Sequence, residues 1–311
     1  MTIAITDKVH PLLVQGLEAK GHTVIYDTHI DNESLATLLP TLDGVIINSK
    51  IKMSAYMIDL GVKLKFIGRL GSGMEIIDVA YAKTKNIKCI NTPDGNCDAV
   101  AEHAIGMLLC LANNIIIANQ QTKNFQWYRE ANRGFEIMGK TIGIIGVGHT
   151  GSALANKLKG FDMNILGYDK YKNLEDIDLP HVEMTTLEDI QNRADIISFH
   201  LPLSNETKYF ANENFFNDCK KGVIIINTSR GNVIETEALV NALVVGHVKG
   251  ACLDVFENEK VNTFSKYERK IYDQLAQNSN IIMTPHIAGW TYESLERIAT
   301  LMLDRIQKSI S

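Results

Sequence analysis

The chain of 311 residues is 45% hydrophobic and 22% charged, and its formal net charge is −5. This composition is ordinary for a folded globular protein of about two domains, and it excludes a disordered chain. Acidic and basic residues are interspersed along the sequence without a basic tail or patch, so nothing favours a nucleic acid as a partner.

The first part of the chain alternates short β-branched runs with helical patterns, which is typical of a parallel sheet covered by helices. The runs that we predict to be strands are 2–6, 23–26, 45–48, 66–69 and 88–91. Amphipathic segments at 11–20 and 78–85 lie between them and are predicted to be helices.

An uncharged stretch follows at 104–122. It is long enough to raise the question of a membrane span. The stretch contains side-chain amides that are costly in lipid, namely Asn113, Asn114, Asn119, Gln120 and Gln121. We therefore predict one helix buried between domains or subunits, and no membrane association.

A second series of strands and helices begins after this stretch. Its predicted strands are 141–145, 164–168, 195–200, 223–227, 251–255 and 281–283, with helical patterns between them as at 235–243. A last helix at 292–307 is predicted to pack back on the first sheet. The fold class is therefore α/β with two doubly wound parallel sheets, and the second domain is inserted in the first. We place a substrate domain at 1–97 and 289–311, and a cofactor domain at 98–288.

The second series opens with a glycine loop. Gly146, Gly148 and Gly151 form G-x-G-x-x-G between an apolar strand and a helical pattern, which permits a tight turn and close approach of a pyrophosphate to the helix N-terminus. The next strand ends in Asp169, 18 residues after Gly151 and close to the ~20 expected of a carboxylate that binds ribose hydroxyls. Since a carboxylate repels a 2′-phosphate, the pattern predicts NAD rather than NADP, a preference that the neighbouring Lys170 weakens.

Three later strands end in residues that carry chemistry. Arg230 follows strand 223–227, Glu259 follows strand 251–255, and His286 follows strand 281–283. Each alone has an ordinary explanation, such as a surface ion pair or a loop charge. In a doubly wound sheet, however, the ligand lies beyond the carboxyl ends of the strands, so together they place a cation, an acid and an imidazole at one edge.

Hydride chemistry explains this set. Reducing a ketone by hydride creates an alkoxide, which takes a proton from a group that titrates near neutral pH, and histidine is suited to that task. A carboxylate nearby favours the imidazolium and orients it. An arginine holds a carboxylate substrate by paired hydrogen bonds and polarises its carbonyl. We therefore predict His286 as the acid–base group, Glu259 as its partner and Arg230 as the substrate clamp.

With these residues in place, the sequence resembles the D-isomer-specific 2-hydroxyacid dehydrogenases over nearly its whole length. The matching motifs are the glycine loop and the stretches 68–73 (GRLGSG), 99–103 (AVAEH), 200–203 (HLPL), 227–231 (NTSRG), 253–256 (LDVF) and 284–286 (TPH). The resemblance implies a Rossmann cofactor domain inserted in a flavodoxin-like substrate domain. It also implies a homodimer joined through the cofactor domain.

The resemblance implies roles for further residues. Backbone N–H groups of Ser72 and Gly73 would bind the substrate carboxylate, Asp254 would hold the nicotinamide carboxamide, and Thr207 would lie near the cofactor phosphates. The remaining residues of the matching motifs that we expect at the cofactor are His149, Thr150, His200, Pro202, Thr228 and His286. The family pattern is not complete, since Glu75 replaces an aspartate, Lys260 a proline and Trp290 a small residue.

The substrate is predicted from cations that we expect around one pocket. Arg69 lies beside the loop 71–73, and an arginine at this place binds phosphate in the resembling D-3-phosphoglycerate dehydrogenases. Residues 127–129 (Trp-Tyr-Arg) resemble a segment that contributes a cation from the partner subunit. Another phosphate-binding arginine is replaced here by Asn48, with Lys50 nearby. We therefore expect oxidation of D-3-phosphoglycerate, the entry to serine synthesis.

Three alternatives remain open. One is a hydroxypyruvate or glyoxylate reductase. Another is a nucleotide-sensing corepressor-like protein, which would need a partner-binding extension. A formate dehydrogenase is disfavoured because those relatives pair the histidine with an amide, whereas Glu259 is a carboxylate.

The cysteines indicate the compartment. Their number is odd, and their spacing is not that of metal ligands. They are Cys89, Cys97, Cys110, Cys219 and Cys252. This pattern fits a reducing compartment better than a disulfide framework. The N-terminus lacks the pattern of a signal peptide. We therefore expect a cytoplasmic protein without a bound metal.

Overall fold

The computed structural model describes residues 1–172 and 178–310. The chain forms two compact units. The first consists of Met1–Cys97 with Trp290–Ser311, and the second of Asp98–Gly289. The chain thus passes between the units twice, after Cys97 and after Gly289.

The first unit is built on a five-stranded parallel sheet in the order β2-β1-β3-β4-β5, which is the flavodoxin-like order. Its strands are β1 (Thr2–Ile5), β2 (Thr23–Tyr26), β3 (Gly44–Ile47), β4 (Phe66–Arg69) and β5 (Lys88–Asn91). Its helices are α1 (Pro11–Ala19), α2 (Asn32–Leu38), α3 (Ala55–Leu60), α4 (Val79–Thr84) and α12 (Tyr292–Ile310).

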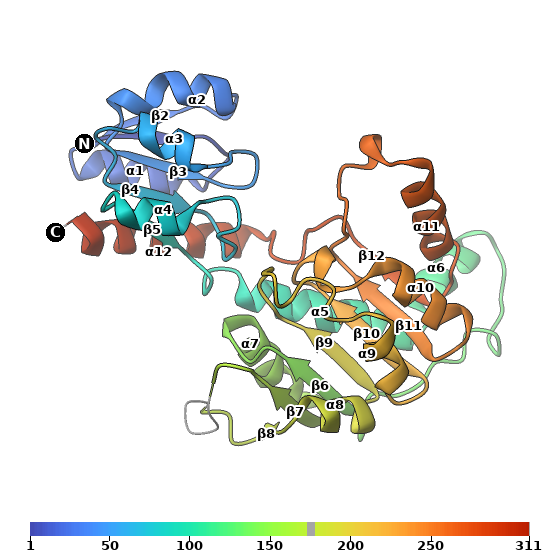
Figure 1. Ribbon diagram of the computed structural model, residues 1–311. Coiled ribbons are helices and arrows are strands. Elements are labelled where there is room, and N and C mark those ends of the chain that lie inside the picture. Colours follow the sequence, from blue (N-terminus) through green and yellow to red (C-terminus); the bar gives the residue numbers. More distant parts are fainter. Residues whose placement is uncertain (173–177, 311) are drawn as a thin grey trace. The chain divides into compact units, whose positions relative to one another are not determined.

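Both faces of this sheet are covered (Figure 1). Alternate residues of a strand point to opposite faces, so Ile3 and Ile5 pack with α1 and α12, whereas Ala4 packs with α2, α3 and α4. The part of α12 that is buried here comes from the far end of the chain and includes Met302 and Ile306. The predicted return of the last helix to the first sheet is therefore confirmed.

The second unit is built on a seven-stranded parallel sheet in the order β12-β11-β10-β9-β6-β7-β8. Its strands are β6 (Thr141–Ile145), β7 (Asn164–Tyr168), β8 (Glu183–Met184), β9 (Ile196–Phe199), β10 (Val223–Asn227), β11 (Val248–Leu253) and β12 (Ile281–Met283). Reading from β8, its first six strands follow the order 3-2-1-4-5-6 of a dinucleotide-binding fold. The predicted α/β class with two doubly wound sheets is confirmed.

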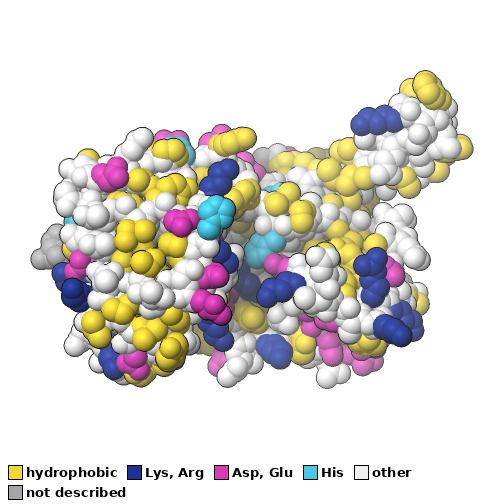
Figure 2. Space-filling view, turned by 90° about the horizontal axis from the view of Figure 1, so that it is seen from above, with side chains coloured by type: hydrophobic (Ala, Val, Ile, Leu, Met, Phe, Trp, Pro, Cys, Tyr) yellow, Lys and Arg dark blue, Asp and Glu magenta, His cyan; other side chains and the backbone are white. Residues whose placement is uncertain are grey.

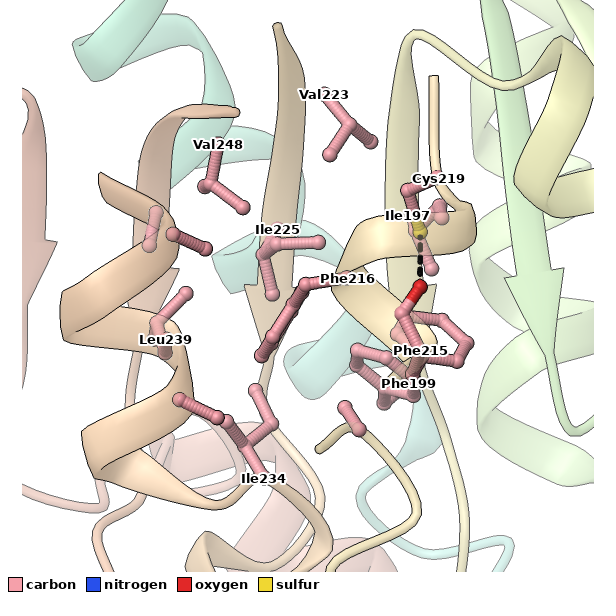
Figure 3. Packing of buried hydrophobic residues seen from close by; sticks show 14 of the residues in the cluster. Ile197, Phe199, Phe215, Phe216, Cys219, Val223, Ile225, Ile234, Leu239 and Val248 are labelled. Carbon is pink, nitrogen blue, oxygen red and sulfur yellow. Dashed lines mark hydrogen bonds between the residues drawn. The ribbon is translucent and has the colours of Figure 1, made fainter. Parts of the chain in front are cut away.

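Helices cover both faces of the second sheet as well. The helices of this part of the chain are α5 (Cys97–Ala112), α6 (Ile115–Lys123), α7 (His149–Leu158), α8 (Leu187–Arg193), α9 (Glu213–Asp218), α10 (Thr236–Val244) and α11 (Lys266–Ala276). One face packs against α5 and α7, and the other against α8 to α11. Figure 3 shows the core on the latter face, where Phe199, Phe215 and Phe216 pack against Ile225. There the Cys219 thiol donates a hydrogen bond to the Phe215 carbonyl at 3.1 Å.

The structure corrects two sequence predictions. The helix predicted over 104–122 is two helices, α5 and α6, bent by 61° at a break where Asn114 has φ +53°. Asparagine tolerates this left-handed conformation better than most residues, and the periodic pattern did not reveal the break. The strand predicted over 251–255 is β11, Val248–Leu253. Lys249 and Gly250 interrupt the apolar pattern at its start, so the sequence placed that start too late. Asp254 follows its last residue, Leu253.

Among the described residues, no single helix is long and apolar enough to cross a membrane. Helices α5 and α6 meet that test only as a bent pair, by length and composition. Helix α5 buries nine of its side chains, whereas α6 buries none.

Candidate active site

The glycine loop lies where the strand order of the second sheet reverses, between β6 and its neighbour β9. Gly146 has φ +94°, and a Cβ there would lie 2.5 Å from the His200 carbonyl oxygen. A Cβ at Gly151 would lie 2.1 Å from the carbonyl oxygen of Gly146. Only glycine therefore fits at these two positions. Helix α7 begins at His149, and the free N–H groups of its first turn lie at the carboxyl edge of the sheet.

Asp169 follows β7 and is held in place by backbone donors. Its Oδ2 accepts a hydrogen bond from Val147 N at 3.0 Å, and its Oδ1 accepts one from Tyr171 N at 3.0 Å. A carboxylate has about four lone-pair sites, so both oxygens retain capacity for ribose hydroxyls. Together with the glycine loop, Asp169 fits the adenosine half of a dinucleotide.

The loop after β9 is closed by Thr207. Its hydroxyl donates to the Pro202 carbonyl at 2.6 Å and accepts from Ser204 N at 2.8 Å. His200, at the start of this loop, contacts the Ser198 hydroxyl through Nε2 at 2.9 Å. Burial lowers the pKa of His200 to about 4, so its ring is neutral at neutral pH.

Two polar atoms at this edge retain unused hydrogen-bonding capacity. Within residues 1–172 and 178–310, His200 Nδ1 and Thr228 Oγ1 are buried without a hydrogen-bond partner. Such atoms are rare in folded proteins and call for an explanation. A polar ligand at this edge would satisfy them, which supports the expectation of a cofactor here.

Arg230 lies just beyond the end of β10, in a turn that is stabilised by hydrogen bonds to a buried asparagine. Asn227, which is 1% exposed, accepts hydrogen bonds from Ser229 and donates one to the Arg230 carbonyl at 3.0 Å. The Arg230 guanidinium donates to the Ser229 carbonyl at 2.7 Å. The next residue, Gly231, lies so close to Phe256 that a Cβ would come within 2.0 Å of its backbone. The turn after β10 and the loop after β11 are therefore in contact.

Glu259 and His286 form a pair. Glu259 Oε2 lies 2.8 Å from His286 Nδ1, and Phe256 N donates to Glu259 Oε1 at 3.4 Å. Partial burial acts to raise the pKa of Glu259, but the hydrogen bond and charge of His286, together with the charge of Arg230, hold the pKa below its usual value. The carboxylate is therefore charged at neutral pH. Among the described residues Nε2 of His286 has no partner, which leaves that nitrogen available for proton transfer.

The backbone of His286 is held by Asp254. His286 has φ +56°, a left-handed conformation that is uncommon outside glycine. Its N–H donates to the Asp254 carbonyl at 2.8 Å, and the next two N–H groups, of Ile287 and Ala288, donate to the Asp254 carboxylate at 2.9 and 2.8 Å. Asp254 is 1% exposed. Its carboxylate therefore anchors the turn that presents the imidazole.

Sequence reasoning assigned Asp254 to the nicotinamide carboxamide, and it missed both the anchoring role of this residue and two residues connected to it. Thr284 donates its hydroxyl hydrogen to Asp254 Oδ1 at 2.6 Å, and His103 on α5 contacts the Thr284 hydroxyl at 3.0 Å. His103, Asp254 and Thr284 all lie in motifs of the family resemblance, but no local pattern shows that they contact one another. The network connects α5 to the turn after β12.

The predicted substrate residues lie in the first unit, in the loop after β4. Gly71 has φ +113° and exchanges hydrogen bonds with Thr92, through its N–H to the hydroxyl and its carbonyl to the amide. The Arg69 guanidinium donates to the Leu70 carbonyl. Across the described parts of the chain, the N–H groups of Ser72 and Gly73 have no acceptor, so they can receive an anion. The structure thus groups Arg230, Glu259 and His286 in one unit, and Arg69, Ser72 and Gly73 in the other.

Comparisons with known proteins agree with this organisation. The family described as "D-isomer specific 2-hydroxyacid dehydrogenase, NAD binding domain" matches residues 105–288. The chain is 35% identical to a hydroxypyruvate reductase from Thermotoga maritima, over 99% of this chain and 98% of that enzyme. It is 34% identical to the human D-3-phosphoglycerate dehydrogenase over 98% of this chain, but it spans only 56% of that enzyme's length. A solved structure of D-lactate dehydrogenase from Aquifex aeolicus, complexed with NAD and lactic acid, is 28% identical with a TM-score of 0.87, covering 100% of this chain and 95% of that one.

Proposed function

The chain belongs to the D-isomer-specific 2-hydroxyacid dehydrogenases, and from this premise we propose that it oxidises D-3-phosphoglycerate to 3-phosphohydroxypyruvate, the first step towards serine. As a family member it is an NAD-dependent oxidoreductase that acts on a CH–OH group. The observation that carries the catalytic assignment is the contact between Glu259 and the Nδ1 atom of His286, which leaves Nε2 for the substrate.

The proposed chemistry divides the work among three side chains. NAD, held by the glycine loop and Asp169, would supply the hydride acceptor for the carbon of the CH–OH group. His286 Nε2 takes the hydroxyl proton in oxidation and returns it to the carbonyl oxygen in reduction. Glu259 contacts Nδ1 and so fixes the orientation of the ring. Arg230, at the end of β10, binds the substrate carboxylate and stabilises negative charge on the reacting oxygen.

The charge of Glu259 gives a pH prediction. Because its pKa is lowered, the carboxylate stays charged across the neutral range and its contribution is lost only as the pH falls through that lowered value. We expect Glu259→Gln to move the alkaline limb of the pH profile of ketone reduction to lower pH, because the neutral amide no longer favours the protonated imidazole. The measurement is kcat/KM against pH, with the exposed Glu136→Gln as a control. An alkaline limb at the same pH in Glu259→Gln would contradict the coupling.

The phosphate specificity is supported by the charges of the first unit. Arg69 ends β4 next to the loop that offers two N–H groups, and a guanidinium suits a dianionic phosphate better than an uncharged group. Lys50 donates to the Thr28 carbonyl at 2.6 Å, and Asn48 stands where the resembling enzymes carry a further arginine. The phosphate site would therefore depend mainly on Arg69.

A homodimer through the second unit is part of the proposal. Helix α6 buries no side chain, and the segment after it exposes Phe125 completely and Trp127 by 77%. Exposed hydrophobic side chains appear in yellow in Figure 2. Apolar surface of this kind is typical of subunit interfaces, and Arg129 on the same segment would add a cation to the partner's site.

Hydroxypyruvate reduction is the second candidate, because the Thermotoga enzyme of that name matches over almost its whole length. Glyoxylate reduction belongs to the same alternative. A corepressor-like role remains the third, and steady turnover of NADH with any 2-oxo acid would exclude it.

Arg69→Ala is the deciding variant for the substrate. We expect phosphohydroxypyruvate to be reduced with a higher kcat/KM than hydroxypyruvate by the unmodified protein. Since charge-assisted hydrogen bonds contribute roughly 1.5–3 kcal/mol, Arg69→Ala should lower kcat/KM for the phosphorylated substrate about 10- to 100-fold and spare the other. Lys63→Ala, which removes an exposed cation of the same unit, is the control. If the phosphorylated substrate has no higher kcat/KM, or if Arg69→Ala lowers kcat/KM for both substrates equally, the protein is a hydroxypyruvate or glyoxylate reductase.

A further inference from the structure

A charged contact connects the two loops beside the adenosine half of the cofactor site. Lys170, which directly follows Asp169, places Nζ 3.0 Å from Glu206 Oε2. The Tyr171 hydroxyl donates to the same oxygen. Lys170 and Tyr171 follow β7, and Glu206 lies on the loop after β9, so the contact spans from one side of β6 to the other. We call these three residues the Glu206 bridge.

Both charges of the bridge are present at neutral pH. The hydrogen bonds of Tyr171 and Lys170 hold the pKa of Glu206 below its usual value, and the bond to Glu206 raises the pKa of Lys170. The other cation of this loop, Lys172, donates instead to the Val147 carbonyl at 2.8 Å. The segment around Asp169 therefore holds a cation that Glu206 neutralises directly.

We propose that Glu206 is a cofactor-selectivity residue, which withholds the Lys170 ammonium from a 2′-phosphate and so disfavours NADP(H). Asp169 discriminates by its own negative charge, but Lys170 beside it would offset that charge if it were unpaired. Glu206 pairs with the ammonium and places a second carboxylate against the segment that directly follows Asp169. From the sequence alone, the charge of Lys170 weakens the predicted preference for NAD over NADP. The structure shows that Glu206 pairs with this charge.

The proposal explains why a chain with lysine after the ribose-binding acid can still select NAD. It rests on the dinucleotide site and not on the identity of the hydroxy acid. Because the bridge is about half exposed, with side-chain exposures of 58% for Lys170 and 56% for Glu206, water and salt weaken it. The expected effect of removing it is therefore moderate.

The test is direct binding of NADH and NADPH without substrate, measured by nucleotide fluorescence at low salt. The selectivity is the ratio of the Kd of NADPH to the Kd of NADH. We expect Glu206→Gln to lower this ratio about fivefold, as one unscreened charge pair near a surface allows, mainly through tighter NADPH binding. The gain should shrink in about 1 M salt, where the Debye length is about 3 Å.

Two double variants identify the cation that is released. Glu206→Gln combined with Lys170→Gln should lose the gain in NADPH affinity, whereas Glu206→Gln combined with Lys172→Gln should keep it. Glu136→Gln, which removes an exposed acid elsewhere in the same unit, should leave the ratio unchanged. An unchanged ratio in Glu206→Gln overturns the proposal, and so does a gain that persists without Lys170. Failure of the phosphoglycerate assignment would leave these binding ratios untouched, so the two failures are distinguishable.

Discussion

Replacing His286 by asparagine should lower kcat for the reduction of a 2-oxo acid by about 10²–10⁴-fold, the usual contribution of general acid–base catalysis. The Kd of NADH should stay close to that of the unmodified protein, because His286 acts on the proton. Asparagine is the suitable replacement since it tolerates the left-handed backbone that His286 adopts at φ +56°. Single-turnover rates together with NADH titration measure both quantities.

The matched comparison is His286→Asn combined with Glu259→Gln. If Glu259 acts through the imidazole, it should contribute little once His286 is absent, so the double variant should be hardly slower than His286→Asn alone. Near-normal turnover in His286→Asn would contradict the assignment of the acid–base group, and independent losses in the double variant would contradict the pairing.

The second large effect is expected at Asp254. Its buried carboxylate accepts two N–H groups of the turn after β12 and the Thr284 hydroxyl. In Asp254→Ala these donors lose their acceptor, and unsatisfied buried groups cost roughly 1–3 kcal/mol each. We expect a loss of about 3 kcal/mol in the free energy of unfolding of the second unit, or roughly 6–12 °C in Tm, and a fall in kcat because the turn no longer fixes His286.

Thr284→Val provides the graded comparison. It removes one of the three donors and leaves the carboxylate bound to the backbone, so its Tm and its kcat should fall less than those of Asp254→Ala. Differential scanning calorimetry and initial rates give the two values. A Tm in Asp254→Ala equal to that of the unmodified protein would show that the turn does not depend on the carboxylate.

Most of the sheet architecture could be predicted from the sequence. The strands at 66–69, 88–91, 141–145, 164–168, 223–227 and 281–283 have the predicted bounds. The strands at 66–69, 141–145, 164–168 and 223–227 are short apolar runs that are largely buried on both faces of parallel sheets, and such runs are continuous in the sequence. The edge strands at 88–91 and 281–283 are less buried. The strand with Lys249 and Gly250 near its start was misplaced because those residues interrupt its run.

The remaining features depend on contacts that no local pattern contains. The break between α5 and α6 lies in a continuous uncharged stretch, and the left-handed backbone of Asn114 reveals it. The residues of the candidate site were identified as acids, bases and cations at strand ends. That Asp254 anchors the turn of His286, and that Glu206 pairs with Lys170, follows from loops distant in sequence that the sheet brings together.

The discontinuous first unit has a consequence for the order of folding during synthesis. One face of its sheet, including Ile3, Ile5 and Phe66, is covered in part by Ile298, Met302 and Ile306 of α12. At about 5–20 residues per second, the ribosome needs on the order of ten seconds or more to pass from β5 to that helix. The second unit, which is continuous, can complete its core in this interval. The first unit stays partly open on that face until α12 emerges, and chaperones that bind apolar surface have that interval in which to act.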